Sequence, residues 1–421
     1  MSDPIPPPVA PLAPSAFSSL RVPAYRVLWW GGLFSFMSVQ MQFLLRGILA
    51  WNLTERESAL GLTYLLFGMA MLVSTPLGGV ATDRFPKKRV LLLSQGVITI
   101  AAVGMGIVVS LGVEQFWMLL LAAVAQGGAF GFYGPARVAF ASDLVGRDQL
   151  GNAITLAMLS MNGTRVFAPS LAGALAGIAV IGIGGAYLVS GAFSVFSLLA
   201  LLRLPHHPAA LKSTRGPLAD IADGVRYVKQ RPKLRRLMLT SFVVIMFGFN
   251  YVAFLPALVK DVFGMGDGHV GLISSASSLG AVAVSVPLAK RADSAQAPRI
   301  MLFAGFFFGA GVFALGLSST FWLAFAVIAV VGGGTNAYQS LSNTLALAMS
   351  DDAHQGRVQS LMQLSFAGFG IAALPLGALA EVIGLRPTIQ IMGAVASVAM
   401  VVFWLLERAE SMSSTGAASR T

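Results

Sequence analysis

Long apolar segments alternate with short polar connections along almost the whole chain. A helix needs about 20 apolar residues to cross a bilayer, and helices satisfy their own backbone groups in lipid. By this measure we expect twelve spans, at about residues 27–51, 58–82, 89–112, 115–141, 152–179, 182–202, 237–259, 269–289, 299–317, 320–348, 358–383 and 387–406. The pattern predicts an all-α membrane protein with twelve transmembrane helices.

The longest polar connection, at about residues 203–236, separates two sets of six spans. Within it, apolar residues recur at helical spacing, which predicts an amphipathic helix on the inner membrane surface. These residues are Leu218, Ile221, Ala222, Val225 and Val228. We therefore expect a disordered cytoplasmic tail at 1–20, a six-helix bundle at 21–203, a cytoplasmic linker at 204–236, a second bundle at 237–406 and a cytoplasmic tail at 407–421.

The distribution of Lys and Arg predicts how the spans are oriented. Of 28 such residues, 22 lie on the side shared by the termini and alternate connections, three on the opposite side and three within spans. Because positive residues are retained on the cytoplasmic side, both termini should be cytoplasmic. The same distribution explains the net charge of +11 without a nucleic-acid partner. We expect a monomer in the bacterial inner membrane, whose partners are the lipid bilayer and a small-molecule substrate.

Composition excludes several classes of function. Only 11% of the residues are charged, against about 25% in soluble proteins. No cysteine is present, and the four histidines lie outside the apolar segments without metal-ligand spacing. No P-loop and no set of nucleophile, base and acid is visible in the sequence. We expect neither an enzyme nor a metal or other cofactor.

The two sets of spans resemble each other in sequence. Residues match at an offset of 210 or 205, and the pairs include Gly61 with Gly271, Asp83 with Asp293, Gly127 with Gly332 and Tyr133 with Tyr338. An ordered series of matches indicates an internal repeat. Repeats of six spans are typical of transporters built from two pseudo-symmetric bundles, with the substrate at their interface.

The connection between the second and third spans carries an acid and four bases within seven residues. Its distinctive residues are, in order, Gly79, Asp83, Arg84, Lys87, Lys88 and Arg89. This order resembles the signature of the major facilitator superfamily, with Pro86 where a second Gly is usual. The resemblance covers the chain from about Tyr25 to Leu406.

Further segments resemble the branch of this superfamily that contains siderophore exporters and macrolide efflux pumps. Gly134-Pro135-Ala136-Arg137 ends the fourth span, and the segment 168–173 in the fifth is similar to the Gly-Pro motif of exporter helices. In drug/proton antiporters an Arg precedes a Gln-Gly pair of the fourth span by three residues, and here that position is Ala123. The resemblance implies an exporter but leaves its proton coupling open.

The resemblance also implies an inner gate latch around the charged connection. The candidate residues are Gly79, Asp83, Arg84, Lys87, Lys88, Arg89, Arg137 and Asp143. We expect Arg137, near the inner end of the fourth span, to pair with Asp83. The alternative is purely topological, since positive connections remain in the cytoplasm whatever else they do.

The resemblance further implies that the first, fourth, seventh and tenth spans line a central cavity. Substrate candidates, two of them in the fifth span, are Gln40, Gln42, Arg46, Gln126, Asn162, Arg165, Asn250, Tyr251, Asn336, Tyr338 and Gln339. An Arg at the membrane centre costs about 2.5–3.5 kcal/mol, so Arg165 should face protein or a water-filled cavity. The alternative is structural, because amides join helices to one another and Arg46 has the option of snorkelling.

None of the 17 acidic residues lies in the middle of a span. A coupling carboxylate usually has a pKa raised by burial, whereas the candidates here, Asp83, Asp143 and Glu381, lie at helix ends. The predicted function is secondary active export of amphipathic small molecules, of drug or siderophore type, by alternating access. Proton antiport is one version of this function and would use one of these carboxylates. The alternatives are a facilitator or exporter of an organic anion or lysolipid without proton coupling, and a non-transporting membrane receptor.

Overall fold

The computed structural model describes residues 17–205, 217–289, 291, 294, 296–351 and 354–418. Across these residues the regular structure is helical and includes no strand. The elements are η1 (Ser18–Arg21), α1 (Pro23–Thr54), α2 (Glu57–Arg84), α3 (Lys87–Ser110), α4 (Phe116–Val145), α5 (Arg147–Gly177), α6 (Gly182–Leu202), α7 (Pro217–Gln230), α8 (Pro232–Val243), η2 (Val244–Gly248), α9 (Tyr251–Ala257), η3 (Leu258–Val262), α10 (Asp267–Ala289), α11 (Ala297–Leu317), α12 (Phe321–Ala348), α13 (Gln355–Ile383) and α14 (Leu385–Ala418).

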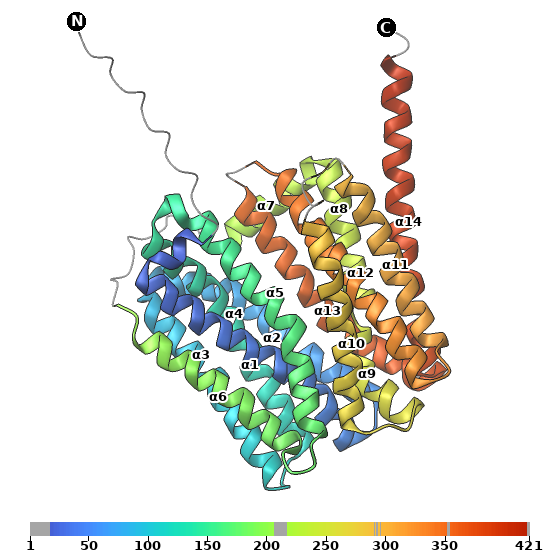
Figure 1. The fold of residues 1–421 in the computed structure, drawn as a ribbon. Coiled ribbons are helices and arrows are strands. Elements are labelled where there is room, and N and C mark those ends of the chain that lie inside the picture. The colour runs from blue at the N-terminus through green and yellow to red at the C-terminus, as the bar shows by residue number, and fades with distance from the viewer. Residues whose placement is uncertain are drawn as a thin grey trace, which may run out of the picture.

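The first helix begins and the last helix ends at the same end of the molecule, where α7 also lies (Figure 1). We call this the tail end and the opposite one the far end. The last helix continues beyond the expected limit at residue 406 and reaches Ala418, projecting past the other helices. Single glycines in left-handed conformation separate two pairs of long helices, because they reverse the chain without a Cβ clash. They are Gly146 (φ 74°) between α4 and α5, and Gly384 (φ 93°) between α13 and α14.

Ten helical segments are long and apolar enough to cross a membrane, counting the described residues alone. They are α1, α2, α3, α4, α6, the composite segment Pro232–Val262, Asp267–Ser285 of α10, α11, α12 and Leu385–Ala409 of α14. α5 and α13 have 31 and 29 residues but fall outside this set. Each of the twelve expected ranges nevertheless coincides with a helical segment.

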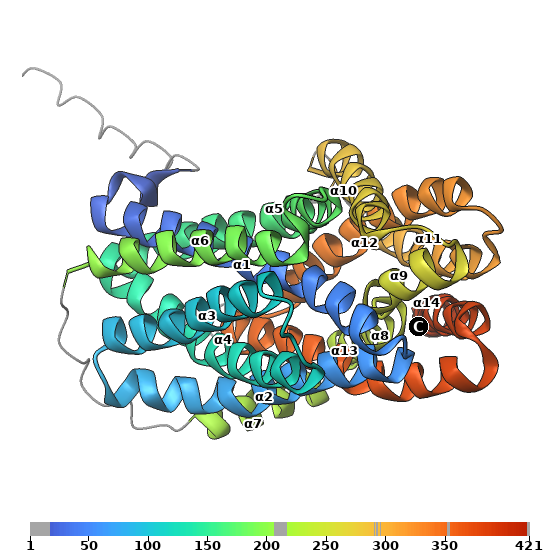
Figure 2. The ribbon, with the colours of Figure 1, turned by 90° about the horizontal axis from the view of Figure 1, so that it is seen from below.

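We call α1–α6 the first group of helices and α8–α14 the second group; most of each group lies on its own side of the view from below (Figure 2). Two pairs of helices meet between the groups: α2 packs along α13, and α5 packs along α10. We call these contacts the α2–α13 seam and the α5–α10 seam. Both are extensive, so the relative position of the two groups is determined mainly by these four helices.

Glycines at equivalent positions of the internal repeat make both seams. A Cβ added to Gly61 of α2 would meet the backbone of Ala373 in α13, and one added to Gly271 of α10 would meet Gly173 in α5. The same correspondence occurs within the groups, where Gly127 packs on the carbonyl of Phe67, and Gly332 on that of Ser277. Small residues allow membrane helices to approach this closely. The matches at offsets 210 and 205 therefore mark shared packing positions.

The expected seventh span is interrupted by two π-helical segments, η2 and η3, on either side of α9. Gly248 ends the first, and Pro256 lies just before the second. Between them Asn250 donates from Nδ2 to the carbonyl of Phe369 in α13, at 3.1 Å. Wider turns of this kind often occur at functional positions. The apolar pattern predicts a span here but contains no sign of its breaks.

The connecting helix α7 lies at the tail end and packs on the start of α13. Gly224 contacts Arg357, which pairs with Asp223 at 2.7 Å. Tyr227 is 6% exposed, whereas Val225, expected on the same apolar face as Val228, is 50% exposed. The packed face is thus rotated from the one that the apolar spacing predicts. Side chains of Leu218 and Ile221 lie outside the described part of the chain.

Candidate functional site

At the far end, the α2–α13 seam carries a polar contact between the two groups. Glu381 of α13 accepts hydrogen bonds from the backbone N–H of Ser58 (3.2 Å) and from its hydroxyl (2.6 Å). Directly beside it, a Cβ on Gly377 would meet the backbone of Glu57. Glu381, which the sequence suggests as a coupling carboxylate, therefore joins the first turn of α2 to the last turns of α13.

A second polar contact joins the groups at the same end. Lys260 of η3 pairs with Asp267 of α10 at 2.7 Å and also donates to the side-chain oxygen of Asn52 in α1. Asn52 in turn donates to Asp267 at 3.4 Å. These three residues were not among the candidates expected from the sequence. Lys260 is, however, one of the three basic residues expected on the side opposite the termini. Together with Glu381 and Ser58, the residues of this contact join the two groups of helices at the far end.

On the tail-end side of these contacts lies an aromatic cluster formed by Phe43 of α1, Tyr64 of α2 and Phe369 of α13. Ring centroids are 4.7 Å apart for Phe43 and Tyr64, and 5.6 Å for each contact with Phe369. The Tyr64 hydroxyl also donates to the Phe43 carbonyl at 2.9 Å. The cluster therefore adds an aromatic contact between the two groups on the tail-end side of the polar contacts.

Two of the predicted substrate residues, Arg46 and Gln126, lie together next to this cluster. The Arg46 guanidinium donates to Gln126 Oε1 and lies 4.7 Å from the centroid of the Phe67 ring. Both residues are buried, at 3% and 1% exposure. Arg46 Nη1 and Gln126 Nε2 have no hydrogen-bond partner among the described residues. Burial in the first group excludes the snorkelling alternative for Arg46.

Another predicted pair, Arg165 and Gln339, crosses between the two groups. Arg165 of α5 donates from Nη1 to Gln339 Oε1 of α12 at 2.7 Å. Farther along the same interface, the hydroxyls of Ser170 and Ser278 are 3.0 Å apart, and Ser278 also donates to the Val166 carbonyl. Arg165 of the first group is thus bonded to the second group, about 18 Å along α5 from its far-end terminus.

The remaining substrate candidates of the second group bond to their own neighbours. Asn336 donates to Ser285 at 2.8 Å, and Tyr338 donates to Ser241 at 3.2 Å. Tyr251 is 3% exposed. Asn250 likewise bonds to α13. Such contacts are expected if these residues join helices to one another and do not bind substrate.

Three further candidates lie in the first group, besides Arg46, Gln126 and Arg165. Gln42 is buried and donates to the Ser38 hydroxyl one turn earlier in α1, at 3.0 Å. Gln40 is partly buried, and Asn162 is exposed. Gln42 is therefore satisfied within its own helix, while Gln40 and Asn162 remain accessible.

The predicted gate residues at the tail end make contacts within the first group. Lys87 pairs with Asp143 at 2.6 Å, which ties the start of α3 to the end of α4. Lys88 donates to the carbonyls of Leu202 (2.9 Å) and Leu204, at the end of α6. A cation is favourable there because the last carbonyls of a helix carry partial negative charge. These lysines hold α3, α4 and α6 together.

The expected pair of Arg137 and Asp83 is not formed. Arg137 is 8% exposed, lies against Gly32 of α1 and stacks 4.9 Å from the Phe36 ring centroid. In the described part of the chain, no hydrogen bond or ion pair involves the Asp83 side chain. In this conformation Arg137 therefore contacts an aromatic face and not the carboxylate at the end of α2.

Other residues of the signature lie near the surface. Arg84 and Arg89 are exposed and Gly79 is partly exposed. Its neighbour Gly78 is the buried glycine, packed on Gly131 of α4. The repeat partner Asp293 lies outside the described residues.

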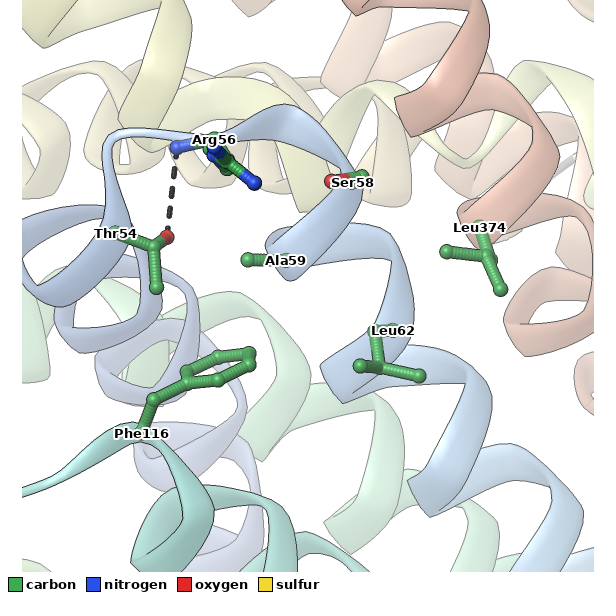
Figure 3. A pocket seen from close by; sticks show the side chains of 7 residues that line it. All are labelled: Thr54, Arg56, Ser58, Ala59, Leu62, Phe116 and Leu374. Carbon is green, nitrogen blue, oxygen red and sulfur yellow. Dashed lines mark hydrogen bonds between the residues drawn. The ribbon is translucent and has the colours of Figure 1, made fainter.

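A pocket of about 440 Å³ opens at the far end, where side chains of α2 and α13 face the start of α4 (Figure 3). Its lining residues are Thr54, Arg56, Ser58, Ala59, Leu62, Phe116 and Leu374. The backbone N–H of Arg56 donates to the Thr54 hydroxyl, which shapes the turn between α1 and α2. The pocket lies on the far-end side of the aromatic cluster. None of the predicted substrate residues lines it.

Comparison with known proteins agrees with this architecture. The enterobactin exporter EntS of Shigella flexneri is 28% identical over 362 residues, covering 85% of each chain. That of Escherichia coli O139:H28 is 27% identical over 361 residues, with the same coverage. The chain is thus similar to curated exporters over most of its length.

Solved structures show the fold. A bacterial homologue of the human lysosomal transporter Spinster, inward-facing and unoccupied, has a TM-score of 0.71 at 17% identity, covering 92% of this chain and 97% of that one. The nucleoside transporter NupG has a TM-score of 0.69 at 15% identity, covering 91% and 98%. Residues 14–420 match the family described as transmembrane secretion effector. The chain therefore belongs to the transmembrane secretion effector family of the major facilitator superfamily, whose members are transporters and not enzymes.

Proposed function

We propose that this protein is a secondary active exporter of amphipathic small molecules, of the drug or siderophore type. Twelve helices, with α5 and α13 included, form two pseudo-symmetric six-helix bundles that rock about a central site. The observation that carries the proposal is the Arg165–Gln339 hydrogen bond, which crosses between the two groups. An exporter needs polar groups at this position, because substrate must be held where both bundles reach it. The curated relatives named enterobactin exporters support the direction of transport.

Alternating access requires one end to close while the other opens. The contacts of Ser58 with Glu381, and of Asn52 with Lys260, cross between the bundles at the far end. We therefore interpret this conformation as the one closed at the far end. The positive-inside rule places the tail end in the cytoplasm, so substrate would enter there and leave at the far end.

Among the coupling candidates, Glu381 is favoured by its position. Asp143 pairs with Lys87 inside the first bundle, whereas Glu381 bonds across the α2–α13 seam. Protonation of Glu381 would remove the negative charge that strengthens its bonds to Ser58. A proton taken up from the far side would thus weaken this contact, which would link the protonation state of Glu381 to opening of the α2–α13 seam.

The test is transport in inverted membrane vesicles with a panel of dyes, antibiotics and siderophores, with and without a pH gradient. We expect at least one amphipathic member to accumulate, and accumulation to fall with Arg165→Ala but not with Arg299→Ala, which alters an exposed arginine. Absence of accumulation for the whole panel, with Arg165→Ala indistinguishable from wild type, would favour the receptor alternative.

A second candidate is export of an organic anion without proton coupling. It is favoured by two arginines in the interior, Arg46 and Arg165, in a chain that has no acid in the middle of an expected span. Collapse of the proton gradient separates the candidates. Accumulation that persists after collapse supports anion export, and accumulation that stops supports antiport.

A further inference from the structure

Arg46 and Gln126 together present two unused hydrogen-bond donors in the interior of the first group. Arg46 Nη2 and Gln126 Oε1 bond to each other, which leaves Arg46 Nη1 and Gln126 Nε2 without partners among the described residues. A neutral amide has both donors and acceptors, whereas a guanidinium has donors only. Buried polar groups in native proteins almost always have a partner, so two adjacent donors that the protein does not satisfy are suited to bind the acceptor atoms of a ligand.

The positive charge of Arg46 is also not balanced by the protein. The ion pairs formed by the described residues do not include it. α1 contains no acid, and the acids of α2 and α4 are Glu57, Asp83 and Asp143 at the helix ends. At 1.5 Å per residue, Asp143 is about 25 Å along α4 from Gln126, and Glu57 is about 15 Å along α2 from Phe67. The Phe67 ring covers one face of the guanidinium but carries no net charge, so it does not neutralise Arg46.

The surroundings of the two donors are apolar and aromatic. Phe67 contacts Phe43 of the aromatic cluster, with ring centroids 6.5 Å apart. Arg46 lies about 12 Å along α1 from Thr54, on the tail-end side of the far-end contacts. A molecule that reaches the two donors from the tail end would therefore place its apolar part against aromatic rings and its acceptor at the guanidinium.

We infer that Arg46 and Gln126 form an anion-binding site for an organic oxyanion, such as a carboxylate on an aromatic body. One oxygen of the anion accepts from Arg46 Nη1 and the other from Gln126 Nε2. The anion supplies the charge that the first group lacks, and its body packs on Phe67. The inference rests on the proposed function, because it names the chemical class of the exported molecule.

The experiment is calorimetric titration of purified full-length protein, at neutral pH, with naphthoate and with its uncharged analogue naphthamide. Hydrogen bonds to charged groups are markedly stronger than neutral ones. We therefore expect the wild type to bind naphthoate at least about tenfold more tightly than naphthamide. Equal affinity for the two probes would overturn the inference.

Gln126→Glu is the most informative variant, since it adds no atoms and gives Arg46 a permanent counter-ion. We expect its melting temperature to rise and its preference for naphthoate to disappear. Arg46→Gln should also lose the preference, while Arg56→Gln, at the exposed far-end pocket, should keep it. A preference that survives in Gln126→Glu, which is expected to fold at least as well as wild type, contradicts the site.

The vesicle panel separates failure of the site from failure of the proposed function. If neutral amphipaths are exported but the wild type shows no naphthoate preference, export stands and the anion site does not. If the preference is present and depends on Arg46, but no panel member accumulates, the site stands and export does not.

Discussion

The two seams join the same two groups of helices with different chemistry. The α5–α10 seam consists mainly of close backbone contacts, because Gly173 and Gly177 lie against Gly271 and Gly268, with the small Ser170–Ser278 contact beside them. The α2–α13 seam adds side chains, namely the aromatic cluster and the bond of Glu381 to Ser58. A seam of glycines should respond to added volume, and a seam of side chains to lost contacts. The difference suggests that α5 and α10 act as the close-fitting pivot, and α2 and α13 as the contact that opens.

The largest effect is expected from Gly173→Leu. Its Cβ would fall on the Gly271 Cα, so α5 and α10 must separate. Overpacking of this kind costs about 1–3 kcal/mol or more. We expect loss of transport and much faster labelling of a cysteine at Ser274, which is buried and shares a face of α10 with Gly271 and Ser278. The chain has no cysteine of its own, so a membrane-impermeant maleimide reports this position alone.

Gly163→Leu is the matched control for this substitution. Gly163 lies in the same helix, and a Cβ there would meet no atom within 4 Å. Labelling and transport should remain close to wild type. If the two leucine variants behave alike, the tight fit of the α5–α10 seam is not what closes the far end.

The next effect is expected from Phe369→Ala in the α2–α13 seam. It removes ring contacts with Phe43 and Tyr64 and leaves a cavity, at a cost of about 3–5 kcal/mol in a packed core. We expect a lower free energy of unfolding in denaturant titration. Phe369→Leu keeps most of the volume and should cost less than about 1.5 kcal/mol. An alanine variant as stable as the leucine variant would show that the cluster does not hold this seam.

Much of the fold follows from the sequence, because the membrane restricts what a long apolar segment can become. Each expected span coincides with a helical segment, and the glycine pair Gly61 and Gly271 occupies equivalent seam positions. The π-helical breaks around α9 were not predictable, since a wider turn changes neither composition nor apolar length. The rotation of α7 was likewise not predictable, because it depends on tertiary contacts with α13, such as those of Gly224 and Asp223 with Arg357.

The candidate site was predictable as a set of residues but not as a set of contacts. Arg46 and Gln126 stand out as polar residues in apolar spans, yet nothing in the sequence pairs positions 80 residues apart. Phe369 was missed because an apolar residue in a span reads the same toward lipid or toward protein. The expected Arg137–Asp83 pair stays a prediction: in this conformation Arg137 lies over an aromatic ring of the neighbouring helix, a contact that the sequence did not suggest.

Glu381→Ala should have a smaller effect on the α2–α13 seam. It removes both hydrogen bonds to Ser58, but the site is exposed, so the loss is about 1 kcal/mol. This corresponds to about fivefold faster labelling of a cysteine at Leu374, which lines the far-end pocket. Glu381→Gln retains an acceptor and should lie between alanine and wild type. If Glu381→Gln labels as fast as Glu381→Ala, the faster labelling is due to loss of the negative charge of Glu381 and not to loss of its hydrogen-bond acceptors.

The smallest effect is expected from Ser278→Ala in the α5–α10 seam. It removes hydroxyl contacts with Ser170 and with the Val166 carbonyl. Interhelical hydrogen bonds in membranes average only about 0.6 kcal/mol, because the separated helices find other partners. Labelling at Ser274 should therefore rise less than about threefold, far below the effect of Gly173→Leu. A double-mutant cycle of Ser170→Ala with Ser278→Ala measures the coupling directly. If the serine bond proves as costly as the added leucine, the α5–α10 seam also depends on side-chain chemistry and the contrast between the two seams disappears.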